Sequence, residues 1–234
     1  MKKPLVVIPA RGGSKGLVNK NKKLLNGMPL ILYTVNAARK VFPDSQIVVS
    51  TDDAEIKEIV ESSGLPVPFL RPEELATDTM GVHDVLLHAI NYSESKGYVP
   101  DTIVLMQPTS PFRTSTHILG AIDLFDKNTE MVVSVKEAKS NPYFVLREEN
   151  EKGWLEKFKE EIFDRRQDCP TVYELNGAIY LIQVDALKRK GISKLSKVRK
   201  YMMSSVCSQD IDTIEDWLIC EMILEKGLLL NEDN

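Results

Sequence analysis

The chain is poor in cysteine and histidine, with only three of each among 234 residues. The cysteines show no C-x-x-C spacing, and their odd number is typical of reduced thiols, so we expect a cytoplasmic protein. The histidines fall on segments of helical character, where a structural or solvated role is the usual one. No Ser-His-Asp or Cys-His set can be assembled, which argues against a covalent nucleophile.

Long apolar runs are also missing. None approaches the ~20 residues that span a bilayer, and Lys2 and Lys3 precede a run too short for a secretory signal, so we expect no membrane contact. The net charge of −4 disfavours a dedicated nucleic-acid binder. The length allows one domain with an appendage, and we treat residues 1–234 as a single domain.

Acidic residues are absent before Asp44, whereas lysine and arginine recur throughout that first stretch. The other end is the reverse: from Asp210 onward Lys226 is the only basic residue among many acidic ones. A cationic beginning fits phosphate binding and an acidic end fits a bound cation, although ordinary surface charge explains most of these residues singly.

Apolar runs and helical periods alternate over the first 140 residues. We expect helices after residues 29, 53, 81 and 115, and strands at residues 5–8, 46–50, 67–70, 102–106 and 131–135. This alternation predicts a parallel sheet with helices on both faces. A further strand is expected at 176–182, and then a last helix at 214–226 whose buried side comprises Ile214, Trp217, Leu218, Met222 and Leu224.

Residues 141–170 break this pattern. They have no clean period and place Trp154, Phe158 and Phe163 among charged residues. Exposed aromatic side chains need a partner to cover them, so we interpret the segment as a dimerisation arm and expect a homodimer. The alternative is a lid that folds back on its own subunit.

The most informative stretch is residues 8–21, where a buried strand ends at Pro9 and a glycine-rich turn follows. Glycine lets backbone N–H groups approach and face a ligand, and clustered cations surround the turn. The turn is neither a P-loop nor a dinucleotide fingerprint, because neither motif's spacing is met. It predicts a phosphate cradle, with a flexible loop of solvated lysines as the alternative.

Three more polar loops follow predicted strand ends, at residues 51–53, 70–79 and 107–111. Ligands of open parallel sheets bind outside the carboxyl ends of the strands, so these loops and the cradle should surround one crevice. Asp210 and Asp212 flank Ile211, and in an extended segment both carboxylates point to the same side. Such a pair suits Mg²⁺, and a helix cap or surface pair is the alternative.

Six ordered segments resemble one known family. They are IPARGGSKGL with a following KN (8–21), STD (50–52), RP-x-E-L-A-x-D-T (71–79), LQPTSP-x-R with methionine first (106–113), RRQD…Y…NGAIY (165–180) and D-I-D-T (210–213). Together they resemble the N-acylneuraminate (sialic acid) cytidylyltransferases. The resemblance implies a Rossmann-like three-layer α/β sandwich with a mostly parallel sheet, of the nucleotide-diphospho-sugar transferase type, plus the small dimerisation arm.

The resemblance also implies a reaction and roles. CTP and a free nonulosonic acid would give a CMP-sugar and pyrophosphate, with the anomeric hydroxyl attacking the α-phosphorus in line and Mg²⁺ bound by Asp210 and Asp212. Catalytic positions are Arg11, Lys20 and Arg166, and sugar-binding positions are Gln107, Arg166 and Tyr180. The nucleotide-binding positions are Ala10, Arg11, Gly12, Gly13, Ser14, Lys20, Asn21, Arg71, Met80 and Val82.

The chain departs from the family pattern in two places. Met80 and Val82 stand where many relatives have small hydroxyl residues that can bond cytosine. Phe144 stands where relatives acting on sialic acid often carry a lysine, so neighbouring Lys139 could hold the sugar carboxylate, or the sugar could be another nonulosonic acid such as legionaminic acid.

Several alternatives remain beside an N-acylneuraminate enzyme. One group is a cytidylyltransferase for legionaminate, pseudaminate or 3-deoxy-manno-octulosonate. Another is a D-x-D glycosyltransferase, which would not need a cradle for a triphosphate. A third, from a different class, is an inactive nucleotide-binding regulator.

Overall fold

The structure is a computed structural model that describes residues 1–13, 16–75, 81–159 and 163–231. At its centre is a six-stranded sheet in the order β10-β6-β9-β5-β1-β4. The strands are β1 (Pro4–Pro9), β4 (Ile47–Ser50), β5 (Thr102–Leu105), β6 (Met131–Glu137), β9 (Tyr173–Gln183) and β10 (Val198–Met202). Strand β9 runs antiparallel to β5 and β6, and the other neighbours pair in parallel. The expected mostly parallel sheet is confirmed.

One expected strand is wrong. Residues 67–70 have no strand structure. Pro66 and Pro68 flank Val67, and because proline has no N–H, this segment cannot form a regular ladder on the edge strand β4. The Val67 N–H donates instead to the carboxylate of Glu61, at 3.4 Å.

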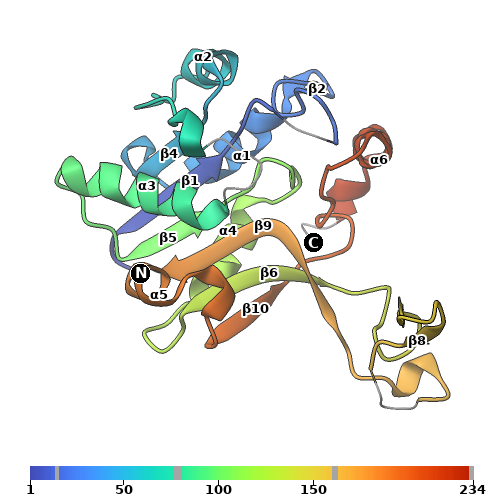
Figure 1. Cartoon of the computed structure of the whole chain (residues 1–234). Coiled ribbons are helices and arrows are strands. Elements are labelled where there is room, and N and C mark those ends of the chain that lie inside the picture. The colour runs from blue at the N-terminus through green and yellow to red at the C-terminus, as the bar shows by residue number, and fades with distance from the viewer. Residues whose placement is uncertain (14–15, 76–80, 160–162, 232–234) are drawn as a thin grey trace.

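Helices cover both faces of the sheet (Figure 1). Helices α1 (Leu30–Arg39), α2 (Ala54–Ser62) and α4 (Ser115–Asp123) pack on one face, and α3 (Val82–Ser95) and α5 (Val184–Lys190) pack on the other. Strand β1 is buried on both sides, with Val6 and Ile8 in one core and Leu5 and Val7 in the other. The three-layer sandwich is therefore confirmed. No helix in the described ranges is long and apolar enough to cross a membrane.

Helix α6 (Ile214–Glu225) packs beside the short hairpin of β2 (Leu24–Leu25) and β3 (Met28–Pro29). The buried side predicted for it is largely wrong: Trp217 is buried, but Ile214, Leu218 and Met222 are exposed, and Leu224 is half-buried. The buried residues are Trp217, Cys220 and Ile223. Because the helix is apolar almost all round, its periodicity does not define one face.

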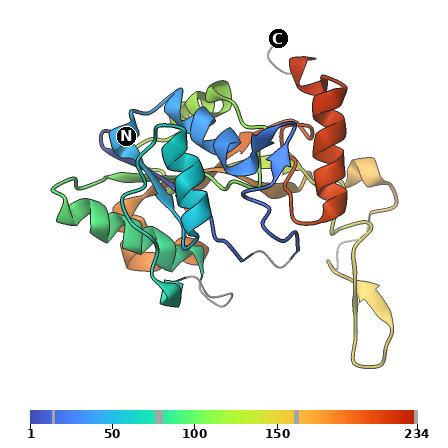
Figure 2. The same cartoon turned by 90° about the horizontal axis from the view of Figure 1, so that it is seen from above.

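The excursion at residues 141–170 leaves the sheet between β6 and β9. It contains a hairpin of β7 (Arg147–Glu149) and β8 (Leu155–Lys157), followed by the short helix η3 (Arg166–Asp168). Both views show the hairpin projecting away from the sheet and its helices (Figures 1 and 2). Trp154, at the turn, keeps 69% of its surface exposed.

The histidines and cysteines take structural places. His117 accepts from the Thr114 N–H at the start of α4, at 3.1 Å, and His88 packs edge-on against Phe69. All three cysteines lie in the described part of the chain, and no disulfide joins them.

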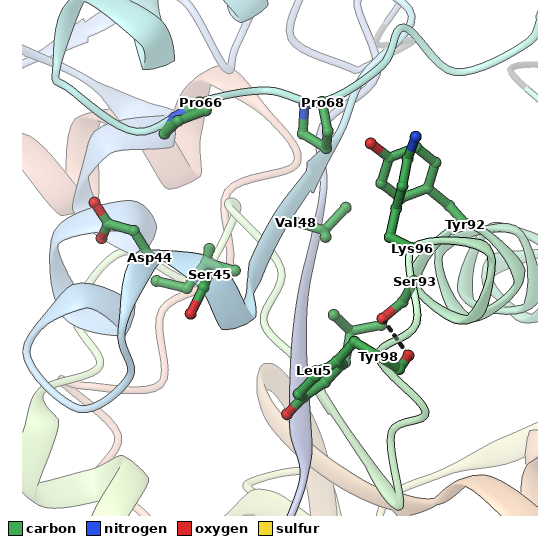
Figure 3. A pocket seen from close by; sticks show the side chains of 11 residues that line it. Leu5, Asp44, Ser45, Val48, Pro66, Pro68, Tyr92, Ser93, Lys96 and Tyr98 are labelled. Atoms are coloured by element: carbon green, nitrogen blue, oxygen red, sulfur yellow. Dashed lines mark hydrogen bonds between the residues drawn. The ribbon is translucent and has the colours of Figure 1, made fainter.

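A small hollow of about 260 Å³ lies near the amino ends of β1 and β4 (Figure 3). Leu5, Val48 and Pro68 line it together with the end of α3, where the Ser93 hydroxyl donates to the Tyr98 carbonyl oxygen. Its lining is mainly apolar. The polar loops predicted to form the site follow the opposite, carboxyl ends of these strands.

Candidate active site

The loops after β1, β4 and β5 meet at the carboxyl edge of the sheet. The Ala10 N–H donates to Ser50 O at 2.9 Å, and the Arg71 N–H donates to Thr51 O at 2.6 Å. Beyond β5, the Met106 N–H donates to Val7 O at 3.1 Å. Parallel strands end at the same edge, so these bonds bring together all four polar loops that the sequence predicts to surround one crevice.

The glycine turn is held by the loop that follows β4. The Gly12 N–H donates to Asp52 Oδ1 at 3.3 Å, and the same oxygen accepts from Arg71 Nη2 at 2.9 Å. A Cβ on Gly12 would lie 2.6 Å from Asp53 Oδ2, so only glycine allows this close approach. Asp53 itself caps α2 by accepting from the Glu55 and Ile56 N–H groups.

Four buried polar atoms in this region have no hydrogen-bond partner among the described residues: Asn21 Oδ1, Ser50 Oγ, Arg71 Nε and Arg113 Nε. Asn21 is nevertheless anchored, since its Nδ2 donates to Arg11 O at 3.0 Å. Buried polar groups are almost always satisfied in folded proteins, and an orphaned donor and acceptor beside a glycine turn fit a ligand-binding role. Two of the four residues, Asn21 and Arg71, are predicted nucleotide-binding residues.

The far end of the cradle contacts the acidic segment near the end of the chain. Lys20 Nζ lies 2.8 Å from Asp212 Oδ1 and donates to Ile211 O at 2.7 Å. A Cβ on Gly16 would lie 2.1 Å from the Asp212 carbonyl oxygen, so this glycine also permits a close backbone approach. Sequence reasoning placed the cradle and the two aspartates in one site, and the fold brings them together.

Asp210 lies deeper than Asp212. Its Oδ1 is 3.5 Å from Ser110 Oγ, and the next residue, Ile211, donates its N–H to Thr109 O at 2.9 Å. Burial raises the pKa of Asp210, and the nearby charge of Asp212 raises it further, against the opposing effects of hydrogen bonds from the Thr109 and Ser110 side chains and of the Lys20 charge. Asp212 keeps 73% of its side chain exposed.

The two aspartates do not cap helix α6. The cap is Thr213, whose side chain accepts from the Asp216 N–H, and Asp216 completes the capping box. The helix-cap alternative for the D-x-D pair is therefore wrong. In the described part of the chain no three His, Cys, Asp or Glu residues form a metal-holding group. A pair of carboxylates matches Mg²⁺, which takes its remaining ligands from substrate phosphates and water.

Arg113 is a residue of this region to which sequence reasoning gave no role. Its fully buried guanidinium donates from Nη1 to Thr34 Oγ1 at 2.5 Å and from Nη2 to the Gln107 carbonyl oxygen. Burial lowers the pKa of Arg113 to about 9, while the charge of Asp210 opposes that shift. The available signal was a basic residue directly after buried Phe112 in a loop that follows a buried strand.

The predicted sugar-binding residues divide into two places. Gln107 and Tyr180 lie at the sheet edge: a Cβ on Gly177 would come 2.5 Å from Gln107 Oε1, and Tyr180 pairs with Leu105 at the end of β5. Burial raises the pKa of the Tyr180 hydroxyl, and the charge of Asp210 adds to the shift. These two side chains therefore belong to the same edge as the aspartates.

Arg166 lies apart from that edge, in η3 of the excursion. Its Nη2 donates to Lys139 O at 2.8 Å. A hollow of about 550 Å³ opens at the base of the excursion, and its lining includes Lys139, Phe158 and Gln209, the residue before Asp210. Within a single chain, Arg166 therefore lies outside the loops that meet at the carboxyl edge of the sheet. Of the other predicted positions, Val82 is the half-buried first residue of α3, and Ser14 and Met80 lie outside the described residues.

Comparison with known proteins identifies this arrangement. The family model described as cytidylyltransferase matches residues 5–227. The chain is 36% identical over 225 residues to the CMP-N,N'-diacetyllegionaminic acid synthase of Legionella pneumophila, covering 94% of this chain and 96% of the relative. It is 33% identical over 220 residues to an N-acylneuraminate cytidylyltransferase of Streptococcus agalactiae, covering 92% of this chain but 52% of that longer relative.

A solved CMP:2-keto-3-deoxy-manno-octonic acid synthetase complexed with CTP has the same fold, with a TM-score of 0.69 at 18% identity over 97% of this chain and 100% of that one. The fold and the sequence relatives point the same way. The chain therefore belongs to the cytidylyltransferase family, among the sialic-acid-type CMP-sugar synthetases, and is a CTP-dependent nucleotidyltransferase.

Proposed function

We propose that the enzyme transfers CMP from CTP to the anomeric hydroxyl of a nonulosonic acid of the N-acylneuraminate type and releases pyrophosphate. The observation that carries this proposal is the contact between Lys20 and Asp212. It joins a glycine turn suited to phosphates with a carboxylate pair suited to a cation, across one crevice. Phosphoryl transfer needs both parts in that relation.

The nucleotide side works by position and charge. We assign Arg11, Lys20 and the backbone of the glycine turn to the triphosphate. Asn21 and Arg71 have a buried acceptor and a buried donor without partners in the described chain. As the sugar oxygen bonds to the α-phosphorus, the bond to the pyrophosphate oxygen breaks and the hydroxyl proton is released. Lys20, held by Asp212 before the nucleotide arrives, can turn to the phosphates.

Asp210 and Asp212 would hold Mg²⁺ together with phosphate oxygens. When bound, the ion neutralises charge on the phosphates and supports the leaving group. Asp210 is oriented by the Ser110 loop, and Ile211 between the two aspartates is fully buried and fixes the segment. The protein supplies only part of a magnesium coordination sphere, as is usual for sites that also bind phosphates.

Legionaminic acid is a second candidate acceptor, and Phe144 favours it. This half-buried side chain replaces the cation that sialic acid enzymes of the family often carry at the position. Relatives of this chain are named for N,N'-diacetyllegionaminic acid, for N-acylneuraminate and for pseudaminic acid. If the acceptor is sialic acid, Lys139 in the lining of the hollow at the base of the excursion would bind the sugar carboxylate in place of the missing cation.

We also propose that the excursion pairs two copies of the chain in the cytoplasm. Trp154 and Leu155 are exposed on a hairpin that projects from the sheet, which is costly unless another surface covers them. Arg166 lies in the same excursion, outside the crevice of its own chain. In a homodimer in which each excursion reaches the neighbouring copy, this arginine would lie at the active site of that copy.

A sugar panel tests the function. Purified enzyme with CTP and Mg²⁺ is assayed for pyrophosphate release in the presence of N-acetylneuraminic, N,N'-diacetyllegionaminic, pseudaminic and 3-deoxy-manno-octulosonic acids. We expect release only with an acid present, and fastest with one of the first two. A D-x-D glycosyltransferase would release no pyrophosphate, and a silent regulator would bind CTP without turnover. Either result refutes the proposal.

A further inference from the structure

Asp52 occupies an unusual place in the nucleotide half of the site. Its Oδ1 accepts from the backbone N–H of Gly12 at 3.3 Å and from Nη2 of Arg71 at 2.9 Å. One carboxylate oxygen thus touches both the turn suited to phosphates and the arginine suited to the base.

The pair is well shielded from water. The side chain of Arg71 is 4% exposed and that of Asp52 is 22% exposed. A buried guanidinium needs a hydrogen-bonded counter-charge, so Asp52 fixes the orientation of the fork through Nη2. Arg71 Nε, also buried, has no partner among the described residues and remains available to a ligand.

The neighbouring carboxylate has a different task. Asp53 caps α2 and pairs with Lys22 at 2.9 Å. The two adjacent aspartates therefore have different roles in the loop after β4. Asp53 caps the helix and also lies close to Gly12, whereas Asp52 hydrogen-bonds both Gly12 and Arg71.

We propose that Asp52 is a positioning residue that couples base recognition to phosphate binding, by holding Arg71 and the Gly12 turn in one fixed relation. The inference rests on the proposed CTP-dependent function. Cytosine N3 is an acceptor, whereas uracil N3 carries a hydrogen. A correctly held arginine donor therefore favours cytosine, and a displaced one loses that preference.

The test uses the full chain and three variants. Asp52→Ala removes both hydrogen bonds, and Asp52→Asn keeps an accepting oxygen but removes the charge. The matched control is Asp44→Ala, which removes another aspartate–arginine pair, the bond of 2.8 Å to Arg39, away from the crevice. Affinities for CTP and for UTP are measured by calorimetry without sugar, alongside kcat/KM for CTP and melting temperature.

We expect Asp52→Ala to weaken CTP binding roughly tenfold or more and to reduce the CTP-over-UTP preference by about the same factor. Asp52→Asn should lie between this variant and the wild type, and Asp44→Ala should keep the wild-type preference. An unchanged preference in Asp52→Ala overturns the inference, even if its melting temperature falls. A wild-type enzyme without measurable CTP binding would instead overturn the proposed function.

Discussion

The two halves of the site are built differently. In the nucleotide half, Asn21 and Arg71 are buried and fixed by bonds to neighbouring loops. In the acceptor half, Arg166 lies in an excursion whose hairpin turn exposes Trp154. One chain thus prepares the nucleotide side in advance, whereas the acceptor side depends on a segment with little support from its own core.

The difference follows from the packing that supports each half. The nucleotide loops leave the ends of parallel strands that are buried on both faces, so a shift of any loop would disturb the core. The described part of the excursion contains a hairpin of two three-residue strands and the short helix η3, which are marginal without further packing. We expect changes in the nucleotide half to alter affinity and changes in the acceptor half to alter assembly and sugar use.

The largest effect should come from Asp212, where the halves meet. Asp212→Ala should lower kcat by roughly 100- to 1000-fold, because a charge that organises the transferring phosphate is lost. Its side chain is 73% exposed and pairs with Lys20 at the surface, so the melting temperature should stay within a degree or two. Steady-state kinetics and thermal unfolding check both statements.

Glu215→Ala is the control for Asp212, since Glu215 is an exposed carboxylate in the first turn of α6. It should leave kcat within about twofold, because surface substitutions rarely matter. Equal turnover in Asp212→Ala and wild type would contradict the metal assignment and the proposed meeting of the halves.

The next effect concerns assembly. Replacing Trp154 and Leu155 by alanine should raise the dimer dissociation constant roughly 10- to 100-fold, because large exposed apolar side chains are the natural anchors of an interface. Sedimentation across a concentration series measures this constant. CTP affinity should not change, because the nucleotide half lies in one chain. A variant that sediments like the wild type at every concentration would remove the dimerisation role of the excursion.

The sheet could be predicted from the sequence because its strands are continuous apolar runs. The place of the site could be predicted because polar loops follow the ends of these strands. Prediction from the sequence failed where packing decides. The edge segment at 67–70 depends on whether β4 can pair with a chain interrupted by prolines, and α6 has apolar residues on every side. The roles of Asp52 and Arg113 depend on contacts with loops distant in sequence, which no local pattern encodes.

A smaller effect is expected at Gly177, where the acceptor half touches the sheet edge. A Cβ there would come within 2.5 Å of Gln107 Oε1 and 3.0 Å of Ser110 Oγ, so Gly177→Ala should displace Gln107 and raise KM for the sugar about tenfold. KM for CTP should change little. Steady-state kinetics with each substrate varied in turn measures both constants.

A second glycine distinguishes the effect of backbone strain from the effect of displacing Gln107. Gly97 has a similar positive φ, +83° against +71°, and nothing within 4 Å of its Cβ position. Gly97→Ala should therefore lose a similar amount of stability, about 1 kcal/mol, with unchanged kinetics. If both variants change the sugar KM alike, strain rather than the position of Gln107 is responsible.

The smallest effect on activity should come from Glu130. This residue precedes β6 and joins it to the segment before the edge strand β10. Its buried carboxylate accepts from Lys190 Nζ at 2.5 Å and from the Ser196 and Lys197 N–H groups at 2.9 and 3.2 Å. These bonds, that of Lys190 first, lower the pKa of Glu130 to about 2. Glu130→Gln should lower the melting temperature at neutral pH by a few degrees, with no change in CTP affinity.

The stability lost in Glu130→Gln should depend on pH. A carboxylate whose pKa is lowered by folding stabilises the native state fully above its unfolded pKa, near 4.5, and that contribution disappears as the pH falls through about 2. The melting temperatures of wild type and Glu130→Gln should therefore converge as the pH falls from about 5 toward 2. A gap that is constant over this range would mean that the carboxylate charge does not hold the sheet edge. A fall in CTP affinity would mean that the two halves are not independent.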